Sequence, residues 1–113
     1  MNFRSPQVPD ITVQELKKLM DAGERIQLLD VRQLMEREVA SLGGHLVPLN
    51  ELPTRVSSLP FSKDQPLIVY CRSGVRSGRA AAFLQSQGFT KVLNLKGGIL
   101  AWSSEIDPSM PAY

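Results

Sequence analysis

The chemistry of this chain is expected to centre on its only cysteine, Cys71. The apolar run of residues 67–70 before it has the pattern of a buried strand, and residues 78–85 after it have the pattern of a helix. The connection contains arginines, serines and a glycine in the order Cys71, Arg72, Ser73, Gly74, Val75, Arg76 and Ser77. A strand-to-helix turn of this composition is suited to forming a thiolate and to holding an anion.

Several physical effects favour a thiolate at Cys71. A helix start has backbone N–H groups without intrahelical partners, and together with the helix dipole they attract negative charge. Next to cationic side chains at such a site, the pKa of a cysteine falls from about 8.5 to values between about 3.5 and 7.5. Gly74 allows backbone angles that turn successive N–H groups inward. Arg72 and Arg76 add positive charge that can pair with the oxygens of an incoming anion.

The two serines and the cysteine each have a second interpretation. Ser73 and Ser77 could hydrogen-bond a sulfur or an oxyanion, but Ser77 also fits an ordinary position in a first helical turn. Cys71 could be a core residue that ends a strand, since free cysteines are among the most buried residue types. A dry core position does not need two arginines and a glycine so close by, and the reactive interpretation is therefore favoured.

The loop from Cys71 to Ser77 resembles the active-site loop of rhodanese-type sulfurtransferases. Further segments resemble family motifs in the family's order: residues 28–32 its Asp-Val-Arg strand end, residues 44–46 its Gly-His-Ile segment, and residues 97–102 its Gly-Gly-x-x-Ala-Trp ending. Each match is weak alone, but together they span most of the chain and are specific. The chain departs from the family where Val47 directly follows Leu46 and where Arg37 follows Glu36. These departures concern the backbone of residues 36–48 and not the cysteine loop.

The resemblance implies a sulfurtransferase mechanism. The Cys71 thiolate would attack the outer sulfur of a sulfane donor such as thiosulfate, and Arg72, Arg76 and loop N–H groups would hold the departing sulfite. A thiophilic acceptor, such as cyanide, a thiol or a carrier protein, would then remove the sulfur from the Cys71 persulfide. No cofactor is expected. The segments 95–102, 106–108 and 111–113 resemble the ends of rhodanese modules fused to adenylyltransferases, which suggests a protein as sulfur donor or acceptor.

Two rival functions remain open. A Cys-dependent phosphatase or arsenate reductase has five residues between the cysteine and an arginine, whereas here Arg76 follows after four and Ser77 occupies the phosphatase arginine position. The loop is therefore sized for sulfur rather than for a tetrahedral oxyanion. A non-catalytic rhodanese-like binding module is the second rival, but such modules usually lack the cysteine that this chain has.

Composition limits the remaining classes. A chain of 113 residues with 42% hydrophobic content is expected to form one domain over residues 1–113, with an irregular N-terminal arm at 1–9 and a tail at 105–113. A single cysteine excludes an internal disulfide, and one cysteine with one histidine does not suffice for a metal site. No signal peptide and no apolar window of about 18 residues is present, so we expect a cytoplasmic protein without membrane contact. A formal charge of +2 does not indicate a nucleic-acid partner.

The pattern of elements predicts an α/β fold. Strands are expected at 26–31, 46–47, 67–70 and 92–95. A helix is expected from a Thr12–Glu15 capping box to Gly23, and another from the cysteine loop to about residue 87. Further helices are expected at 34–42 and 100–104, and a weak one at 49–59. Strands that are apolar on both faces and alternate with helices indicate a parallel sheet covered on both sides. The resemblance implies a rhodanese-like three-layer fold with a mainly parallel, five-stranded sheet flanked by helices.

Parallel strands bring their carboxyl ends to one edge, where ligand sites lie. Asp30, Cys71 and the turn at residues 96–98 are expected there. Asp30 could hydrogen-bond loop N–H groups or an arginine such as Arg32 or Arg76, and equally it could be a plain strand-end residue. We expect His45 and Trp102 to be structural rather than catalytic. The pair at residues 97–98 fits either a close approach to the cysteine loop or a simple helix start.

Overall fold

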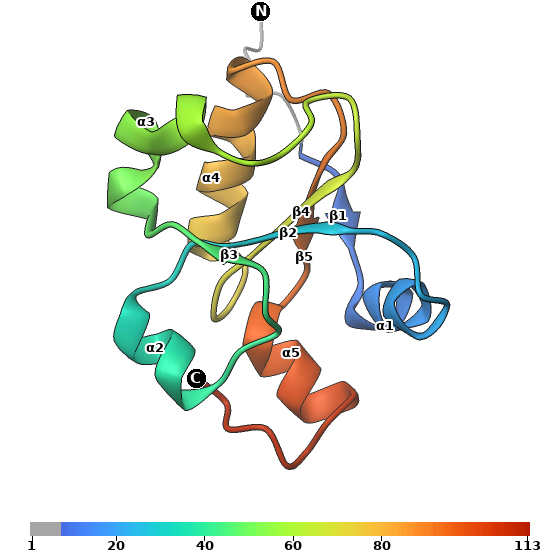
Figure 1. The fold of residues 1–113 in the computed structure, drawn as a ribbon. Coiled ribbons are helices and arrows are strands. Elements are labelled where there is room, and N and C mark those ends of the chain that lie inside the picture. Colours follow the sequence, from blue (N-terminus) through green and yellow to red (C-terminus); the bar gives the residue numbers. More distant parts are fainter. Residues whose placement is uncertain (1–7) are drawn as a thin grey trace, which may run out of the picture.

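The computed structural model describes residues 8–113, so residues 1–7 of the predicted N-terminal arm lie outside the described part. Figure 1 shows the order of the elements along the chain. They are β1 (Asp10–Ile11), α1 (Val13–Asp21), β2 (Gln27–Asp30), α2 (Leu34–Val39), β3 (His45–Leu46), α3 (Leu52–Arg55) between the short 3-10 turns Leu49–Glu51 and Val56–Ser58, β4 (Leu67–Tyr70), α4 (Val75–Ser86), β5 (Val92–Leu95) and α5 (Gly98–Glu105). The predicted strands and helices are therefore present, with some changes at their ends.

The strands form one five-stranded sheet in the order β1-β5-β4-β2-β3, and each neighbouring pair is parallel. The predicted α/β fold with a mainly parallel sheet is confirmed, and the described sheet is parallel throughout. Strand β1 at the edge was not predicted, because two residues carry no readable period. It is held by β5, where Asn94 N donates to Pro9 O and Lys96 N donates to Ile11 O, both at 2.9 Å.

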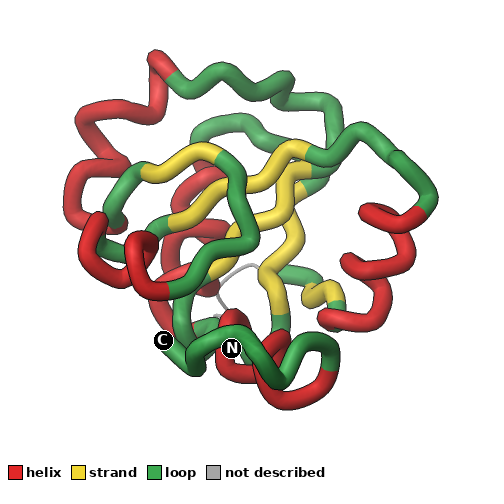
Figure 2. The backbone as a smooth tube through the Cα atoms, turned by 60° about the horizontal axis from the view of Figure 1, so that its bottom comes forward, coloured by secondary structure: helices red, strands yellow, loops and turns green. Residues whose placement is uncertain are grey.

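Helices cover both faces of the sheet, as Figure 2 shows. Strand β4 alternates between the two sides and is buried on both. Its Leu67 and Val69 join the core cluster under α3 and α4, whereas Ile68 and Tyr70 join the cluster under α1 and α5. Trp102 of α5 lies in the second cluster and is 8% exposed, which agrees with its predicted packing role. The parallel register places the carboxyl ends of β2, β4 and β5 at one edge, where Asp30, Cys71 and Lys96 lie.

Helix α2 ends earlier than the sequence predicted. The predicted helix extends to residue 42 and ends before Gly43 and Gly44. In the structure the helix ends at Val39, and Ala40 is extended (φ −152°, ψ 143°). The Ala40 carbonyl accepts a hydrogen bond from Arg32 Nη2 at 2.7 Å. A contact with a residue outside the helix thus takes the place of the next helical turn.

A buried ion pair lies beneath this segment. Arg32 donates to Asp30 through Nε at 3.0 Å and Nη2 at 2.9 Å, and both side chains are fully buried. The backbone N–H of Arg32 also donates to Asp30 Oδ1 at 3.0 Å. The guanidinium further contacts the Tyr70 ring at 5.4 Å. The pair therefore joins the end of β2 to β4 and to the end of α2.

We predict that Asp30→Asn destabilises the protein by about 3–5 kcal/mol, because it leaves the buried Arg32 guanidinium without its counter-charge. The free energy of unfolding in urea measures this effect. Asp21→Asn is the control, since it removes the exposed Lys17–Asp21 pair and should change the unfolding midpoint little. Equal, small effects of the two substitutions would contradict the structural role of the buried pair.

Candidate active site

The sulfur of Cys71 lies in a ring of hydrogen-bond donors. Cys71 follows β4 directly, and its side chain is buried. Its Sγ accepts hydrogen bonds from Gly74 N at 3.1 Å, from Ser77 N at 3.4 Å and from the Ser77 hydroxyl at 3.3 Å. Of the two predicted serine hydroxyls, only that of Ser77 bonds to the sulfur, and Ser73 is exposed.

The loop takes this shape because Gly74 turns it. Gly74 is the N-cap residue of α4 and has φ of +102°, in the left-handed region that glycine adopts readily. No side chain caps this helix at the N-cap position. Instead, Cys71 Sγ accepts from the N–H of Ser77 in the first turn, which would otherwise have no partner inside the helix. The sulfur thus acts as the acceptor at the start of α4.

The surroundings of Cys71 shift its pKa in opposite directions. Burial raises the pKa, because it disfavours the charged thiolate. The hydrogen bond from the Ser77 hydroxyl and those from the N–H groups of Ser77, Gly74 and Ser73 lower it. The pKa of Cys71 is lowered overall, so the donors outweigh the burial and favour a thiolate.

Helix α5 fixes the loop from the other side. Ile99 N donates to Cys71 O and Leu100 N donates to Arg72 O, both at 3.0 Å. A Cβ atom on Gly98 would collide with these two carbonyl oxygens, so only glycine fits there. Of the two interpretations that the sequence left for residues 97–98, the close approach is observed at Gly98. The N–H groups of α5 thus bind the carbonyls of Cys71 and Arg72.

Asn94 of β5 is a site residue that the sequence reasoning missed. Its Nδ2 donates to Gly74 O at 3.1 Å, and its Oδ1 accepts from the Ser77 hydroxyl at 2.5 Å. The Ser77 hydroxyl has one proton, so Asn94 Oδ1 and Cys71 Sγ compete for the same hydrogen bond. A charged thiolate is the stronger acceptor. The feature of the sequence that could have pointed to Asn94 is that it is a polar residue within an otherwise apolar strand.

The two loop arginines lie in different surroundings. Arg76 forms a bidentate pair with Glu36 of α2, with Nη1–Oε1 and Nη2–Oε2 distances of 2.7 Å. These hydrogen bonds lower the pKa of Glu36. Arg72 is exposed, and within residues 8–113 it forms no ion pair. The sequence treated both arginines as anion ligands, but in this structure Arg76 holds a carboxylate of the chain itself.

The predicted supporting residues lie beside this pair. Asp30 bonds to Arg32, one of the partners proposed for it, and Arg37 Nη1 lies 3.6 Å from Asp30 Oδ2, the oxygen that Arg32 Nη2 also contacts. Neither the loop N–H groups nor Arg76 bonds to Asp30. Arg32 Nη1 reaches the backbone carbonyl of Glu36 at 3.4 Å, so the buried pair braces the helix that holds Arg76. His45 packs edge-on against Phe61 with ring centres 6.0 Å apart, which fits a structural role.

Metal-binding clusters and membrane-spanning helices are both absent from the part of the chain that the structure describes. Within residues 8–113, no group of three or more His, Cys, Asp or Glu side chains could hold a metal ion. Over the same residues, no helix is long and apolar enough to cross a membrane.

Comparisons with known proteins agree with the fold. A family model described as a rhodanese-like domain matches residues 12–105. A protein named Sulfurtransferase from Allochromatium vinosum is 38% identical over 97 residues, which cover 85% of this chain and 89% of that protein. A crystal structure of a rhodanese-like domain protein from Staphylococcus aureus superposes with a TM-score of 0.77 at 29% identity, over 88% of this chain and 95% of the other.

Other relatives are longer proteins. The Mycobacterium tuberculosis protein named Probable adenylyltransferase/sulfurtransferase MoeZ is 33% identical over 104 residues, covering 91% of this chain but 26% of that protein. The chain therefore spans about a quarter of the length of this relative.

We predict that Ser77→Ala raises the pKa of Cys71, because the variant loses the hydroxyl that donates to the thiolate. The pH dependence of alkylation of Cys71 by iodoacetamide should move to higher pH than in the unmodified protein. Ser73→Ala is the control, since it keeps the backbone N–H and removes an exposed hydroxyl. A shift of equal size in both variants, or none in Ser77→Ala, would contradict the assigned hydrogen bond.

Gly98→Ala should distort the loop, because the added Cβ meets the carbonyls of Cys71 and Arg72. Gly23→Ala is the matched control: Gly23 also has a positive φ, +70°, but no atom lies within 4 Å of the position that an added Cβ would take. We expect Gly98→Ala to cost about 1–3 kcal/mol more in unfolding free energy than the control. It should also raise the pKa of Cys71. Similar unfolding curves for the two variants would show that the close approach imposes no constraint.

Proposed function

The chain belongs to the rhodanese-like domain family, and from this premise we propose that it is a sulfurtransferase that carries sulfur as a persulfide on Cys71. The observation that carries the proposal is the ring of donors around the Cys71 sulfur, at 3.1–3.4 Å from Gly74 and Ser77. Such a ring lowers the pKa of the thiol and can hold a second sulfur that bears negative charge.

In the first half of the proposed reaction, the Cys71 thiolate attacks the outer sulfur of thiosulfate. The new S–S bond forms as the bond within thiosulfate breaks, and sulfite leaves with the electron pair. Charge then lies on the terminal sulfur of the persulfide, where the N–H groups of Ser73, Gly74 and Ser77 can stabilise it. In the second half, a nucleophile such as cyanide attacks that terminal sulfur, thiocyanate is released and the Cys71 thiolate returns.

The arginines have separate roles in this proposal. Arg72 is exposed and forms no ion pair within residues 8–113, so it can meet the oxygens of an anionic donor. Arg76 is held by Glu36 at the side of the loop and keeps the start of α4 in place. Ser73, Val75 and Ser77 complete the proposed substrate-binding loop, and Asp30 and Arg32 support it from below.

The alternatives fit the site less well. A phosphatase needs an arginine directed into the loop to bind phosphate oxygens, whereas Arg76 is occupied by Glu36. A non-catalytic binding module does not need a cysteine whose pKa is lowered by its surroundings. A protein sulfur donor or acceptor is part of the proposal, because relatives such as MoeZ combine adenylyltransferase and sulfurtransferase in their names. We also propose that the protein acts in the cytoplasm without a cofactor.

Sulfur loading should be stoichiometric, because Cys71 is the only thiol. Incubation with thiosulfate should add the mass of one sulfur atom to the intact protein, and cyanide should remove it. Cys71→Ser should abolish the adduct. Para-nitrophenyl phosphate should be turned over only at background rate. An adduct that survives Cys71→Ser, or phosphatase turnover above sulfur transfer, would overturn the proposal.

Arg72→Ala and Arg76→Ala should separate donor recognition from loop support. Each variant removes one charge-assisted interaction, with the donor in the case of Arg72 and with Glu36 in the case of Arg76. Such an interaction is worth about 1.5–3 kcal/mol, so each variant should lose about ten- to a hundredfold in kcat/KM for thiosulfate. A neutral persulfide donor should restore Arg72→Ala more than Arg76→Ala, because loop distortion affects every donor. Glu36→Gln tests the support of the loop by the Arg76–Glu36 pair from the other partner, and its loss in kcat/KM should also be independent of the donor. Small, equal losses for both arginine variants with both donors would mean that the N–H ring alone binds the anion.

A further inference from the structure

The strongly exposed, large hydrophobic side chains are not scattered over the described residues. They are Leu34, Met35 and Val39 of α2, Val75 at the start of α4, and Tyr113, with exposed fractions of 60%, 66%, 47%, 64% and 42%. Helix α2 has no buried residue at all. Its large apolar side chains therefore contribute little to the core, and a helix that exposes them needs another reason to carry them.

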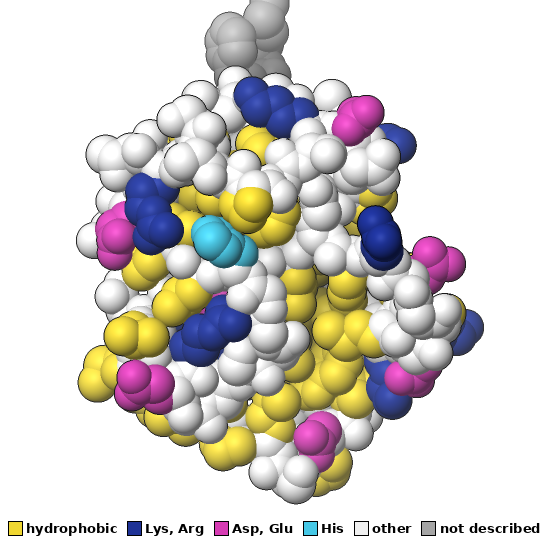
Figure 3. Space-filling view, viewed as in Figure 1, with side chains coloured by type: hydrophobic (Ala, Val, Ile, Leu, Met, Phe, Trp, Pro, Cys, Tyr) yellow, Lys and Arg dark blue, Asp and Glu magenta, His cyan; other side chains and the backbone are white. Residues whose placement is uncertain are grey.

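These side chains lie beside the candidate active site. Glu36, between Met35 and Val39, bonds to Arg76, the residue next to Val75. Tyr113 lies near the same helix, because Arg32 Nη1 is 3.4 Å from both the Glu36 and the Tyr113 carbonyls. We call Leu34, Met35, Val39 and Val75 the apolar rim. In Figure 3, hydrophobic side chains protrude at the lower left, where Figure 1 shows α2.

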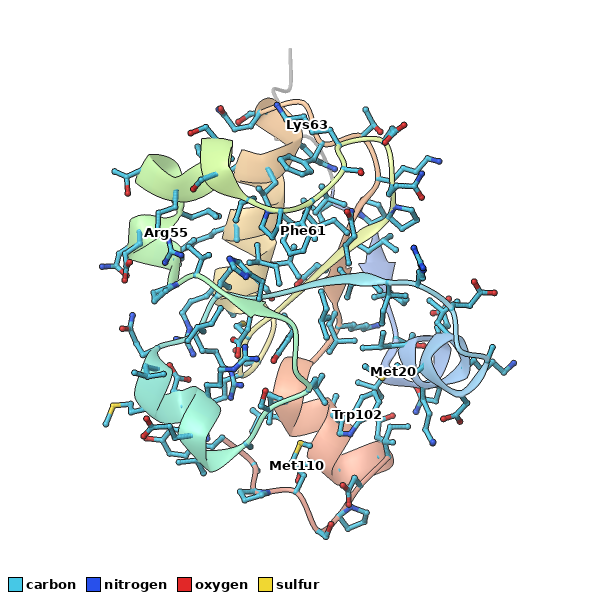
Figure 4. All side chains as sticks on the ribbon, in the orientation of Figure 1. Met20, Arg55, Phe61, Lys63, Trp102 and Met110 are labelled. Atoms are coloured by element: carbon cyan, nitrogen blue, oxygen red, sulfur yellow. The ribbon has the colours of Figure 1, made fainter. Side chains whose placement is uncertain are left out.

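A second hydrophobic area in Figure 3 has a different explanation. It lies towards the centre and right of the same face, between α1 and α5, where Figure 4 labels Met20, Trp102 and Met110. These side chains are partly or largely buried and pack against the core cluster beneath α1 and α5. Packing against the core explains where these side chains lie, but it does not explain the exposed side chains of the apolar rim.

The charge next to the apolar rim is mainly positive. Arg72 and Arg79 are not buried and form no ion pair within residues 8–113. Arg79 is one helical turn from Val75, so the two side chains lie on the same face of α4. Glu36 is neutralised by Arg76, which leaves Glu38 as the other carboxylate on α2. A complementary partner surface would therefore combine acidic and apolar side chains.

We propose that the apolar rim, with Arg72 and Arg79, is a docking surface for a protein that presents a cysteine among acidic and apolar side chains and exchanges sulfur with Cys71. This inference rests on the proposed function. Because Cys71 is only 1% exposed, the partner must bring its sulfur in on a narrow, protruding segment. The partner thiolate attacks the terminal sulfur of the Cys71 persulfide, the S–S bond breaks, and Cys71 leaves as a thiolate while the partner keeps the sulfur.

Synthetic acceptors test the surface directly. The protein is loaded with thiosulfate, and sulfur transfer is timed to cyanide, to a peptide with one cysteine flanked by leucine and glutamate, and to the same peptide with lysine for glutamate. We expect the acidic peptide to exceed the basic one by about tenfold in kcat/KM, which corresponds to about 1.4 kcal/mol. The rate of sulfur transfer to cyanide should not depend on this surface, because cyanide does not need to dock there.

Variants assign the preference to the surface. Arg79→Glu should remove most of the difference between the peptides, whereas Lys91→Glu should preserve it, since Lys91 lies at the opposite end of the sheet. The double variant Leu34→Ser/Met35→Ser should slow both peptides severalfold and leave the cyanide rate unchanged.

The outcomes separate the two proposals. Transfer to cyanide without a preference between the peptides, or a preference that Arg79→Glu and Lys91→Glu change equally, overturns the docking surface alone. Absence of transfer even to cyanide overturns the proposed function and the docking surface with it. A dimer in light scattering that Leu34→Ser/Met35→Ser dissociates would make the apolar rim a contact between copies of this chain and would also overturn the inference.

Discussion

The site depends on the orientation of the peptide groups that follow Cys71. Leu100 N holds the Arg72 carbonyl at 3.0 Å. A trans peptide group has its C=O and N–H on opposite sides, so the N–H of Ser73 in the same unit is directed away from α5. That N–H is one of the donors that lower the pKa of Cys71. Helix α5 thus orients the peptide group that carries the Ser73 N–H, and Gly98 is the residue that permits this close contact.

The hydrogen bonds that lower the pKa of Cys71 come from the Ser77 hydroxyl and from backbone N–H groups of the loop and of the first turn of α4. The charge of Arg76 is paired with Glu36, and that of Arg32 is paired with Asp30. These two ion pairs are joined through the Glu36 backbone, so together they form a support between β2, α2 and α4. Burial opposes the thiolate, and the hydrogen bonds from the Ser77 hydroxyl and from the N–H groups of Ser77, Gly74 and Ser73 together outweigh it. A loop with the same residues but a different peptide orientation would favour a neutral thiol.

The sequence predicted what depends on local pattern. The strands at residues 67–70 and 92–95, the Thr12 capping box and the turn at Gly74 agree with the structure. It did not predict that Arg76 pairs with Glu36, because the two residues are distant in the chain and several acidic residues were equally available. Asn94 was missed because its role depends on the register between β5 and the loop. The end of α2 and strand β1 also depend on contacts with distant residues, which no local pattern records.

The most direct test of this account is a pH titration of the Cys71 thiolate in the unmodified protein, followed by NMR of an isotope-labelled Cβ atom. The donor ring predicts an apparent pKa below the ordinary value of about 8.5 for a free cysteine. A pKa at or above that value would mean that burial outweighs the N–H donors. It would contradict the claim that the backbone of this loop stabilises negative charge on sulfur.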